Sequence, residues 1–191
     1  MNTNDELLDH VDENDVVIGA LLRSEAYDKN IDSIHRMSGV LLVDHVNKKV
    51  LLQQRSDKKR YPLMWVVSAG GHYQAGEDIL DGAYRELDEE LGIETPIVMV
   101  GKEFKLHKDA NSYVYWFIGI YDGQDMKLSK DEIERVKFFS KESLDKMKGS
   151  DFSQVVDYKV YGNKVSGWAY ELAQRYFAGE FDEALVYLQK S

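Results

Sequence analysis

The sequence predicts an α/β fold in which a mixed β-sheet lies in an α/β/α sandwich, with a C-terminal helical extension over residues 140–191. Strand-like apolar runs fill most of the chain up to residue 139, and one amphipathic helix interrupts them at residues 77–91. Helical spacing takes over from Ser140 onward. Strands around one central helix, followed by further helices, favour a sheet covered on both faces. A length of 191 residues indicates a single domain, 1–191.

The strands are predicted from short apolar runs that turn residues separate. Two strands within residues 7–23 flank a turn at Glu13, Asn14 and Asp15, and a hairpin within residues 36–56 turns at Asn47 and Lys48. A short strand at 65–69 ends at Gly70 and Gly71. The remaining strands are expected at 96–106, 112–121 and 133–139.

The central helix is predicted from the spacing of Leu80, Ala83, Leu87 and Leu91, which places them on one apolar stripe. Acidic residues in its first turn favour the helix dipole, and Gly92 is the expected left-handed stop. After residue 140 we expect a first short helix and then one bent helix or two. Their aromatic residues favour a packing stripe over the sheet or a homodimer surface rather than a base-stacking platform; they are Trp168, Tyr170, Tyr176, Phe177, Phe181 and Tyr187.

Composition excludes several functional classes. The chain has 24 Lys plus Arg against 34 Asp plus Glu, for a formal net charge of -10. This charge disfavours a nucleic-acid polymer or an anionic membrane as partner, and requires a metal or local cations if a phosphate ester is to bind. The absence of cysteine excludes disulfides, thiolate metal sites and a thiol nucleophile. No apolar run reaches the ~20 residues of a membrane span, and no signal peptide is recognised, so a cytoplasmic location is expected.

The chemistry-bearing feature is a cluster of carboxylates on the central helix. Glu86 and Glu90 lie four residues apart on one face, with Glu89 on the neighbouring row. Their mutual repulsion would be relieved by a hard divalent cation, Mg²⁺ or Mn²⁺, which takes oxygen ligands. Arg85 is placed to pair with Glu77 and Glu89. A solvated acidic helix face is the alternative explanation for glutamates of this kind.

The segment from Gly71 to Ile93 resembles the Nudix box, with every specified position matched: Gly, five residues, Glu, seven residues, then Arg-Glu-Leu-Asp-Glu-Glu-Leu-Gly-Ile. The resemblance implies a Nudix fold and a loop–helix unit that holds the metal. It implies metal roles for Glu86, Glu89 and Glu90, with the carbonyl of Gly70 as a further ligand. It also implies catalytic roles for Glu86, Glu89 and Arg85.

Outside the box, three stretches between residues 34 and 77 are similar to isopentenyl diphosphate isomerase and the hydrolases closest to it. The isomerase uses a cysteine where this chain has Gly70. His35 and His72 stand at positions matching isomerase metal ligands, but an ungapped alignment places Asn111 and Tyr113 where two glutamates are needed. The resemblance therefore favours a hydrolase over an isomerase.

Further candidates surround the box. Arg55, Lys58, Lys59 and Arg60 form a dense basic run, in which Arg55 and Lys59 are the candidate diphosphate ligands, although a solvated loop explains the run equally well. His72, in the glycine loop, is a candidate substrate ligand. For His35 a structural role is favoured over a second metal site. Glu132 and Glu134 are, with Glu89, candidates for the general base, and an edge-strand acid is the alternative for both.

Together these observations predict a metal-dependent hydrolase that cleaves the phosphoanhydride linkage of a small organic pyrophosphate, with a nucleoside diphosphate derivative favoured. The metal would neutralise phosphate charge and activate water, while a glutamate removes that water's proton. The alternatives are an isomerase-like enzyme and a non-catalytic nucleotide-binding Nudix module. Because this chain keeps the metal carboxylates, the binding module is the weaker alternative.

Overall fold

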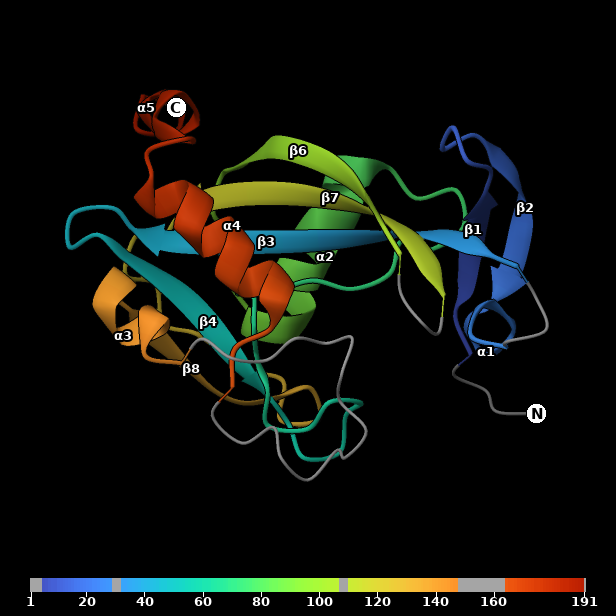
Figure 1. Ribbon diagram of the computed structural model, residues 1–191, viewed down its shortest axis with the longest axis horizontal. Coiled ribbons are helices and arrows are strands. Elements are labelled where there is room, and N and C mark those ends of the chain that lie inside the picture. Colours follow the sequence, from blue (N-terminus) through green and yellow to red (C-terminus); the bar gives the residue numbers. More distant parts are fainter. Residues whose placement is uncertain (1–4, 29–31, 107–109, 148–163, 191) are drawn as a thin grey trace.

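The computed structural model describes residues 5–28, 32–106, 110–147 and 164–190. Its centre is a six-stranded mixed sheet in the order β5-β4-β3-β7-β6, with β8 also paired to β4 (Figure 1). These strands are β3 (Ile34–Asp44), β4 (Lys49–Arg55), β5 (Trp65–Val66), β6 (Ile97–Lys105), β7 (Asn111–Ile120) and β8 (Ile133–Phe139). A separate antiparallel pair consists of β1 (Leu7–Val11) and β2 (Val17–Leu22). The predicted strands are thus confirmed, with small shifts at their ends.

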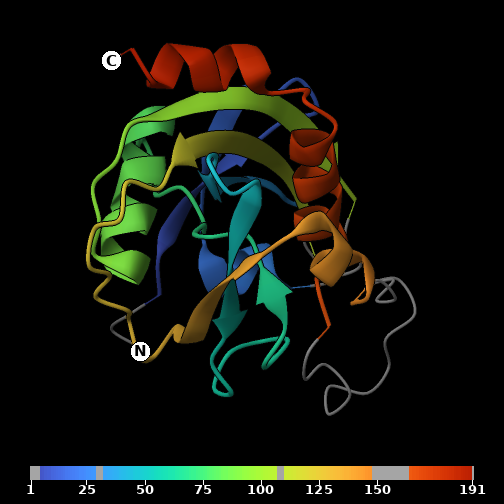
Figure 2. The same ribbon diagram turned by 90° about the vertical axis from the view of Figure 1, so that its left-hand side faces the viewer.

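Helices cover both faces of the main sheet (Figure 2). The described helices are α1 (Arg23–Ala26), which contacts β1 and β2, and α2 (Ile79–Leu91), α3 (Lys141–Asp145), α4 (Gly167–Phe177) and α5 (Asp182–Leu188). The helix α2 lies on one side and α3 and α4 on the other, while α5 lies beside β6 (Figure 2). The expected sandwich is therefore confirmed. None of the described helices is long and apolar enough to span a membrane.

Two hydrophobic cores result from the alternation of side chains along the central strands. On β7, Trp116 and Ile118 pack towards α4 and α5, whereas Phe117 packs towards α2. On β3, Leu41 and Leu42 divide between the two cores in the same way. Both faces of these strands are buried, which explains why their sequences read as continuous apolar runs.

The capping residue Asp78 fixes the start of the helix α2. The side chain of Asp78 accepts a hydrogen bond from Leu80 N at 2.8 Å, and Gly92 ends the helix with φ 63° as expected. One predicted core position is wrong, because Leu80 is 42% exposed. Ile79 takes its place against the core, since the buried stripe runs at four-residue spacing from Ile79 through Ala83.

The C-terminal aromatic residues mostly pack onto the sheet, as the favoured prediction stated. Tyr176 and Phe181 are buried in the core beneath α4 and α5, whereas Tyr187 is 65% exposed. The predicted helical stretch forms two helices, and Gly179 with φ 81° lies in the turn between them. The predicted extension over 140–191 is described at 140–147 and 164–190, and its middle lies outside the described residues.

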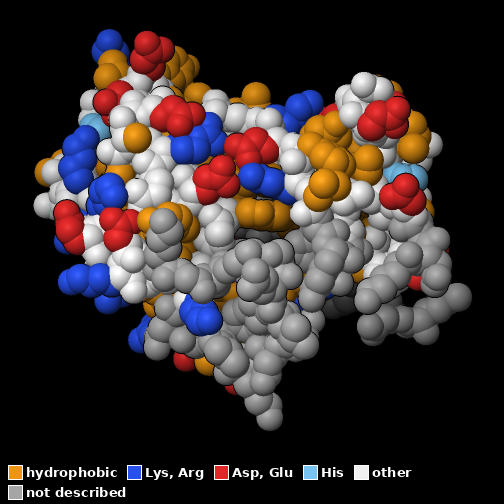
Figure 3. All heavy atoms as spheres, in the orientation of Figure 1, with side chains coloured by type: hydrophobic (Ala, Val, Ile, Leu, Met, Phe, Trp, Pro, Cys, Tyr) orange, Lys and Arg blue, Asp and Glu red, His pale blue; other side chains and the backbone are white. Residues whose placement is uncertain are grey.

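The surface carries acidic and basic side chains together over the face seen in Figure 3, with hydrophobic side chains gathered towards the end that carries β1 and β2. Val17 and Ile18 on β2 are among the exposed large hydrophobic residues. β2 pairs with β1 and is exposed along nearly its whole length.

Candidate active site

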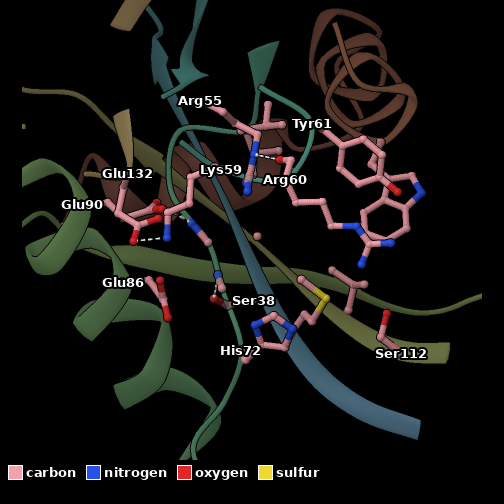
Figure 4. A pocket seen from close by; sticks show the side chains of 18 of the residues that line it. Ser38, Arg55, Lys59, Arg60, Tyr61, His72, Glu86, Glu90, Ser112 and Glu132 are labelled. Carbon is pink, nitrogen blue, oxygen red and sulfur yellow. Dashed lines mark hydrogen bonds and ion pairs between the residues drawn. The ribbon is translucent and has the colours of Figure 1, made fainter. Parts of the chain in front are cut away.

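A cavity of about 540 Å³ opens at the end of the sheet where three segments meet. They are the loop that begins with Gly70 and Gly71 (the glycine loop), the helix α2, and the loop that carries Arg55, Lys58, Lys59 and Arg60 (the basic loop). In Figure 4 the carboxylates of Glu86, Glu90 and Glu132 lie on one side of the cavity, with Lys59 beside Glu132 and Arg55 further across. His72, Ser112 and Tyr61 lie on the other side (Figure 4). The acidic groups and the aromatic groups therefore occupy different ends of one cavity.

The glycine loop lies directly on the carboxylates of α2. A Cβ atom at Gly71 would fall 2.5 Å from Glu86 Oε1, so a side chain at this position would displace the Glu86 carboxylate. Glu90 Oε2 accepts hydrogen bonds from Gly70 N at 2.9 Å and from Gln53 Nε2 at 2.8 Å. A backbone hydrogen bond of 2.8 Å from Ser38 N to Gly71 O connects the same loop to β3.

Burial distinguishes the three glutamates that the helix spacing brings together. Glu86 and Glu90 are buried, whereas the side chain of Glu89 is 57% exposed. Burial raises the pKa of Glu86 to about 7, because desolvation outweighs its bonds to Arg85. Burial, together with the neighbouring Glu86, raises the pKa of Glu90 to about 8. Two adjacent carboxylates are thus held where negative charge is unfavourable without a cation.

Arg85 forms hydrogen bonds to several groups at the acidic end of the cavity. Its guanidinium donates two hydrogen bonds to Glu77, at 2.7 and 2.9 Å, which confirms one predicted pair. A bond of 3.0 Å to Glu89 confirms the second, and a further bond of 2.8 Å reaches Glu86. Arg85 also donates to the carbonyl of His72 at 3.0 Å, so a single side chain connects the loop to the helix.

The donor set suits a hard divalent cation. Glu86 and Glu90 offer buried carboxylate oxygens beside backbone of the glycine loop, and the chain has no thiol to compete for a softer metal. Within the described parts of the chain, no three Asp, Glu or His side chains converge closely enough to form a ready-made metal site. Arg85 bonds one oxygen each of Glu86 and Glu89, which leaves the second oxygen of each carboxylate outside these bonds.

The basic loop divides into residues that face the cavity and one that does not. Arg55 lines the cavity, its Nε donates to Arg60 O at 2.8 Å, and burial lowers its pKa. Lys59 also lines the cavity and forms an ion pair with Glu132. Lys58 is 66% exposed and pairs with Asp131 on the surface. The structure thus brings Arg55 and Lys59 to the cavity, together with Arg60.

The two histidines lie side by side at the aromatic end. Their ring centroids are 5.0 Å apart, and both rings line the cavity. Burial holds the pKa of His72 well below its usual value, with His35 and three arginines acting in the same direction. His72 is therefore a neutral imidazole at pH 7, and any contact that it makes to a phosphate is that of a neutral hydrogen-bonding group.

The two candidate acids near β8 differ in their position relative to the cavity. Glu132 precedes the strand and lines the cavity, while Glu134 is exposed and does not line it. The pair Lys59–Glu132 joins the basic loop to the segment before β8. Glu132 therefore stays a candidate base, and Glu134 has the position of an edge-strand acid.

The cavity face of β7 differs from the ungapped alignment by one residue. Ser112 and Val114 line the cavity, whereas the hydroxyl of Tyr113 donates to Glu13 O at 2.6 Å on the other side of the strand. Pairing of β7 with β3 places Ser112 opposite His35 and sets this register. The residues of β7 that line the cavity are Ser112, Val114 and Trp116, and none of them is a carboxylate. The same holds for Asn111 and Tyr113, the positions given by the ungapped alignment.

Several cavity residues escaped the sequence analysis. Tyr27 and Arg23 come from the N-terminal segment, and no local pattern in the sequence marks them. Trp168 was predicted as a packing residue and does contact Trp116, with ring centroids 6.3 Å apart. It also lines the cavity. The alternation of side chains along a strand at residues 112–116 could have indicated that Ser112 and Trp116 lie on the same face.

Comparison with known proteins identifies the family of the chain. The NUDIX domain model matches residues 34–157, and the chain therefore belongs to the NUDIX domain family. An uncharacterized Nudix hydrolase of Pseudomonas aeruginosa is 31% identical over 137 residues, covering 72% of this chain and 80% of the relative. The isopentenyl-diphosphate Delta-isomerase of Nocardia farcinica is 35% identical over 91 residues, covering 49% and 51%. Both resemblances predicted from the sequence are confirmed.

A crystal structure from Deinococcus radiodurans shares the fold with a TM-score of 0.68 and 22% identity, covering 89% of this chain and 98% of that one. An Ap4A hydrolase of C. elegans has a TM-score of 0.54 and 21% identity, covering 75% of this chain and 95% of that one. Family and fold together define the class of the protein as a Nudix hydrolase, an enzyme that acts on phosphoanhydride bonds.

Proposed function

We propose that this Nudix hydrolase is metal-dependent and cleaves the diphosphate linkage of a small organic pyrophosphate, with a nucleoside diphosphate derivative as the favoured substrate. The observation that carries the proposal is the pair of buried carboxylates, Glu86 and Glu90, held against the glycine loop at one end of a cavity. Burial of such groups is costly without a compensating cation. Arg55 beside them supplies a fixed positive charge for phosphate.

We assign a separate role to each of these residues. Glu86 and Glu90 would hold Mg²⁺ or Mn²⁺, with Glu89 and the carbonyl of Gly70 as further ligands. When bound, the cation offsets phosphate charge and increases the acidity of water. Arg85 keeps the loop and helix together, as its bonds to Glu77 and the His72 carbonyl indicate.

Substrate contacts are assigned to the other residues that line the cavity. Arg55 and Lys59 would bind the phosphates, and His72 would contact the substrate as a neutral group. Glu89 or Glu132 would accept the proton of the attacking water. The chain's net charge of -10 supports a small molecule rather than a nucleic-acid polymer or a membrane as partner. A cytoplasmic location and a homodimer formed through exposed apolar residues are parts of the same proposal.

Isomerase activity is disfavoured by the residues at the site. Transfer of a proton to unactivated carbon needs an acid near the substrate, and the expected cysteine position is Gly70. The cavity face of β7 offers Ser112 and Val114 where carboxylates would be needed. A non-catalytic binding module is disfavoured because Glu86, Glu89 and Glu90 are all present.

The proposal is tested with a substrate panel assayed with Mg²⁺ or Mn²⁺ and after chelation. The panel holds nucleoside di- and triphosphates, ADP-ribose, dinucleotide polyphosphates, nucleotide sugars and isopentenyl diphosphate. ADP-ribose is included because it is bound by the NUDIX domain of Shewanella oneidensis NrtR, a protein of similar fold. Metal-dependent release of a phosphate ester from a nucleoside diphosphate derivative is expected. Turnover that persists after chelation would contradict the metal assignment.

A further inference from the structure

Tyr27 connects three separate walls of the cavity. Its hydroxyl lies 2.8 Å from His72 Nε2, in hydrogen-bond contact with the glycine loop. Its ring lies 5.5 Å from the ring of His35 on β3, and the guanidinium of Arg60 from the basic loop stacks on it at 5.4 Å. The glycine loop, the central sheet and the basic loop therefore meet at one side chain.

The backbone that carries Tyr27 is firmly anchored. The short helix α1 is tied to the start of β1 by Arg23 N to Glu6 O at 2.7 Å and by Ser24 N to Asp5 Oδ1 at 3.0 Å. Ala26 is fully buried, and its carbonyl accepts a bond of 2.8 Å from Ser33 Oγ. Tyr27 thus stands on a fixed support, and its contacts can orient the side chains that it meets.

The same N-terminal segment also supports the loop on the other side of His72. Ala75 N donates to Leu7 O at 2.8 Å, and Gly76 N donates to Asp9 Oδ1 at 3.0 Å. These contacts come from residues that precede the region matched by the family model, which begins at residue 34. The N-terminal segment therefore forms part of the cavity and of its supports.

We infer that Tyr27 is a positioning residue that shapes the aromatic end of the cavity, where the organic group of the diphosphate substrate binds. Its hydroxyl orients the imidazole of His72, and its ring orients the guanidinium of Arg60. This inference rests on the proposed function, because it assigns the acidic end to the diphosphate and the opposite end to the organic group. A residue at this end should affect substrate capture more than the chemical step.

Kinetics of Tyr27→Phe and Tyr27→Leu, measured on the panel substrate that wild type hydrolyses best, test the inference. Tyr27→Phe removes one hydrogen bond and should raise KM about threefold to tenfold, while kcat stays within about twofold. Tyr27→Leu also loses the contact with Arg60, and its KM should rise further. Inorganic pyrophosphate, used as a competing inhibitor, has no organic group, and its inhibition constant should stay within about twofold of the wild-type value in both variants.

The matched control is Tyr113→Phe, which also loses a hydroxyl hydrogen bond, in this case to Glu13 O, but on the side of β7 away from the cavity. Its kinetics should equal those of wild type. If Tyr27→Phe also matched wild type in KM, or if pyrophosphate inhibition weakened as much as KM rose, the inference would be overturned.

A second measurement does not depend on turnover. The ¹⁵N resonance of His72 Nε2, assigned by its loss in His72→Gln, should shift in Tyr27→Phe and stay in place in Tyr113→Phe. An unchanged resonance in Tyr27→Phe would overturn the orienting role of the hydroxyl. If wild type hydrolysed nothing in the panel, the proposed function would fail, and this spectrum would still decide whether Tyr27 orients His72.

Discussion

Glu90 accepts a hydrogen bond of 2.9 Å from the backbone N–H of Gly70, so the last carboxylate of the box is bonded to the loop at which the box begins. The two residues are twenty positions apart, and this bond fixes the loop over the C-terminal end of α2. We therefore expect a substitution at Glu90 to preserve the fold best when the replacement keeps a hydrogen-bond acceptor.

The first prediction concerns Glu86→Gln and Glu90→Gln. Each amide keeps the size and an acceptor oxygen, and both variants should fold. Loss of the cation's carboxylate ligand should lower kcat by about 100-fold or more, because several kcal/mol of charge stabilisation are lost. Glu134→Gln, an exposed acid outside the cavity, is the control and should be fully active. Near-normal metal-dependent activity in a folded Glu86→Gln or Glu90→Gln enzyme would disprove the metal assignment.

The second prediction is that Mg²⁺ or Mn²⁺ stabilises the folded protein. Two adjacent buried carboxylates gain a counter-charge when the cation binds, and ligands that bind only the native state raise its stability, by about 2.7 kcal/mol at 100 times Kd. Thermal unfolding should therefore shift upward with either metal and return after chelation. The shift should be largely absent in Glu90→Gln. An equal shift in wild type and this variant would place the cation elsewhere.

The third prediction concerns the cations of the basic loop. Arg55→Ala removes a guanidinium that lines the cavity and should raise KM about tenfold or more, in line with charged hydrogen bonds. Lys59→Ala should act less strongly, because Lys59 already pairs with Glu132. Both effects should shrink as salt is raised, because added ions shorten the screening length from its ordinary value of about 8–10 Å and weaken charge interactions. Lys58→Ala is the control, because that side chain is exposed outside the cavity. Wild-type kcat/KM for both variants at every salt concentration would show that the loop has no role in binding phosphate.

The fourth prediction separates hydrolase from isomerase. Incubation with isopentenyl diphosphate in D₂O should give no dimethylallyl isomer and no deuterium at the allylic carbon. The reason is that Gly70 stands at the position where the isomerase has its cysteine, and it has no side chain that can transfer a proton to carbon. NMR spectroscopy detects even slow exchange. Metal-dependent deuterium incorporation would contradict the assignment to the hydrolase branch.

The fifth prediction concerns acid stability and Asp15. This buried carboxylate bonds Arg36 at 2.7 Å, Lys102 at 3.0 Å and the hydroxyl of Tyr115. Although desolvation opposes ionisation, these partners hold the pKa of Asp15 below its usual value. A folded-state pKa that is depressed contributes stability above the unfolded value of about 3.9 and loses it as pH falls through the folded value.

The free energy of unfolding should therefore fall more steeply below pH 4 in wild type than in Asp15→Asn. At pH 7 the variant should be less stable by about 3 kcal/mol, because it leaves Arg36 without its main partner. Urea unfolding between pH 2.5 and 7 measures both effects. Parallel pH profiles for the two proteins would show that Asp15 does not control acid stability.

The sequence by itself determined the features that depend on local spacing. The strands, the helix α2 with its Gly92 stop, and the pairing of Arg85 with Glu77 and Glu89 all follow from periods of two and of three to four residues and from turn chemistry. For the same reason, the spacing of residues within the box places its carboxylates at one end of a helix. Leu80 is the exception, because the docking of the first turn decides which side chain meets the core.

Only the tertiary structure decided the relations between distant segments. Parallel pairing with β3 set the register of β7 and turned Ser112, rather than Tyr113, towards the cavity. Packing of the N-terminal segment brought Tyr27 to His72, 45 positions away in the chain. Such contacts arise from burial and from satisfied polar groups across separate elements, and no short spacing in the sequence records them.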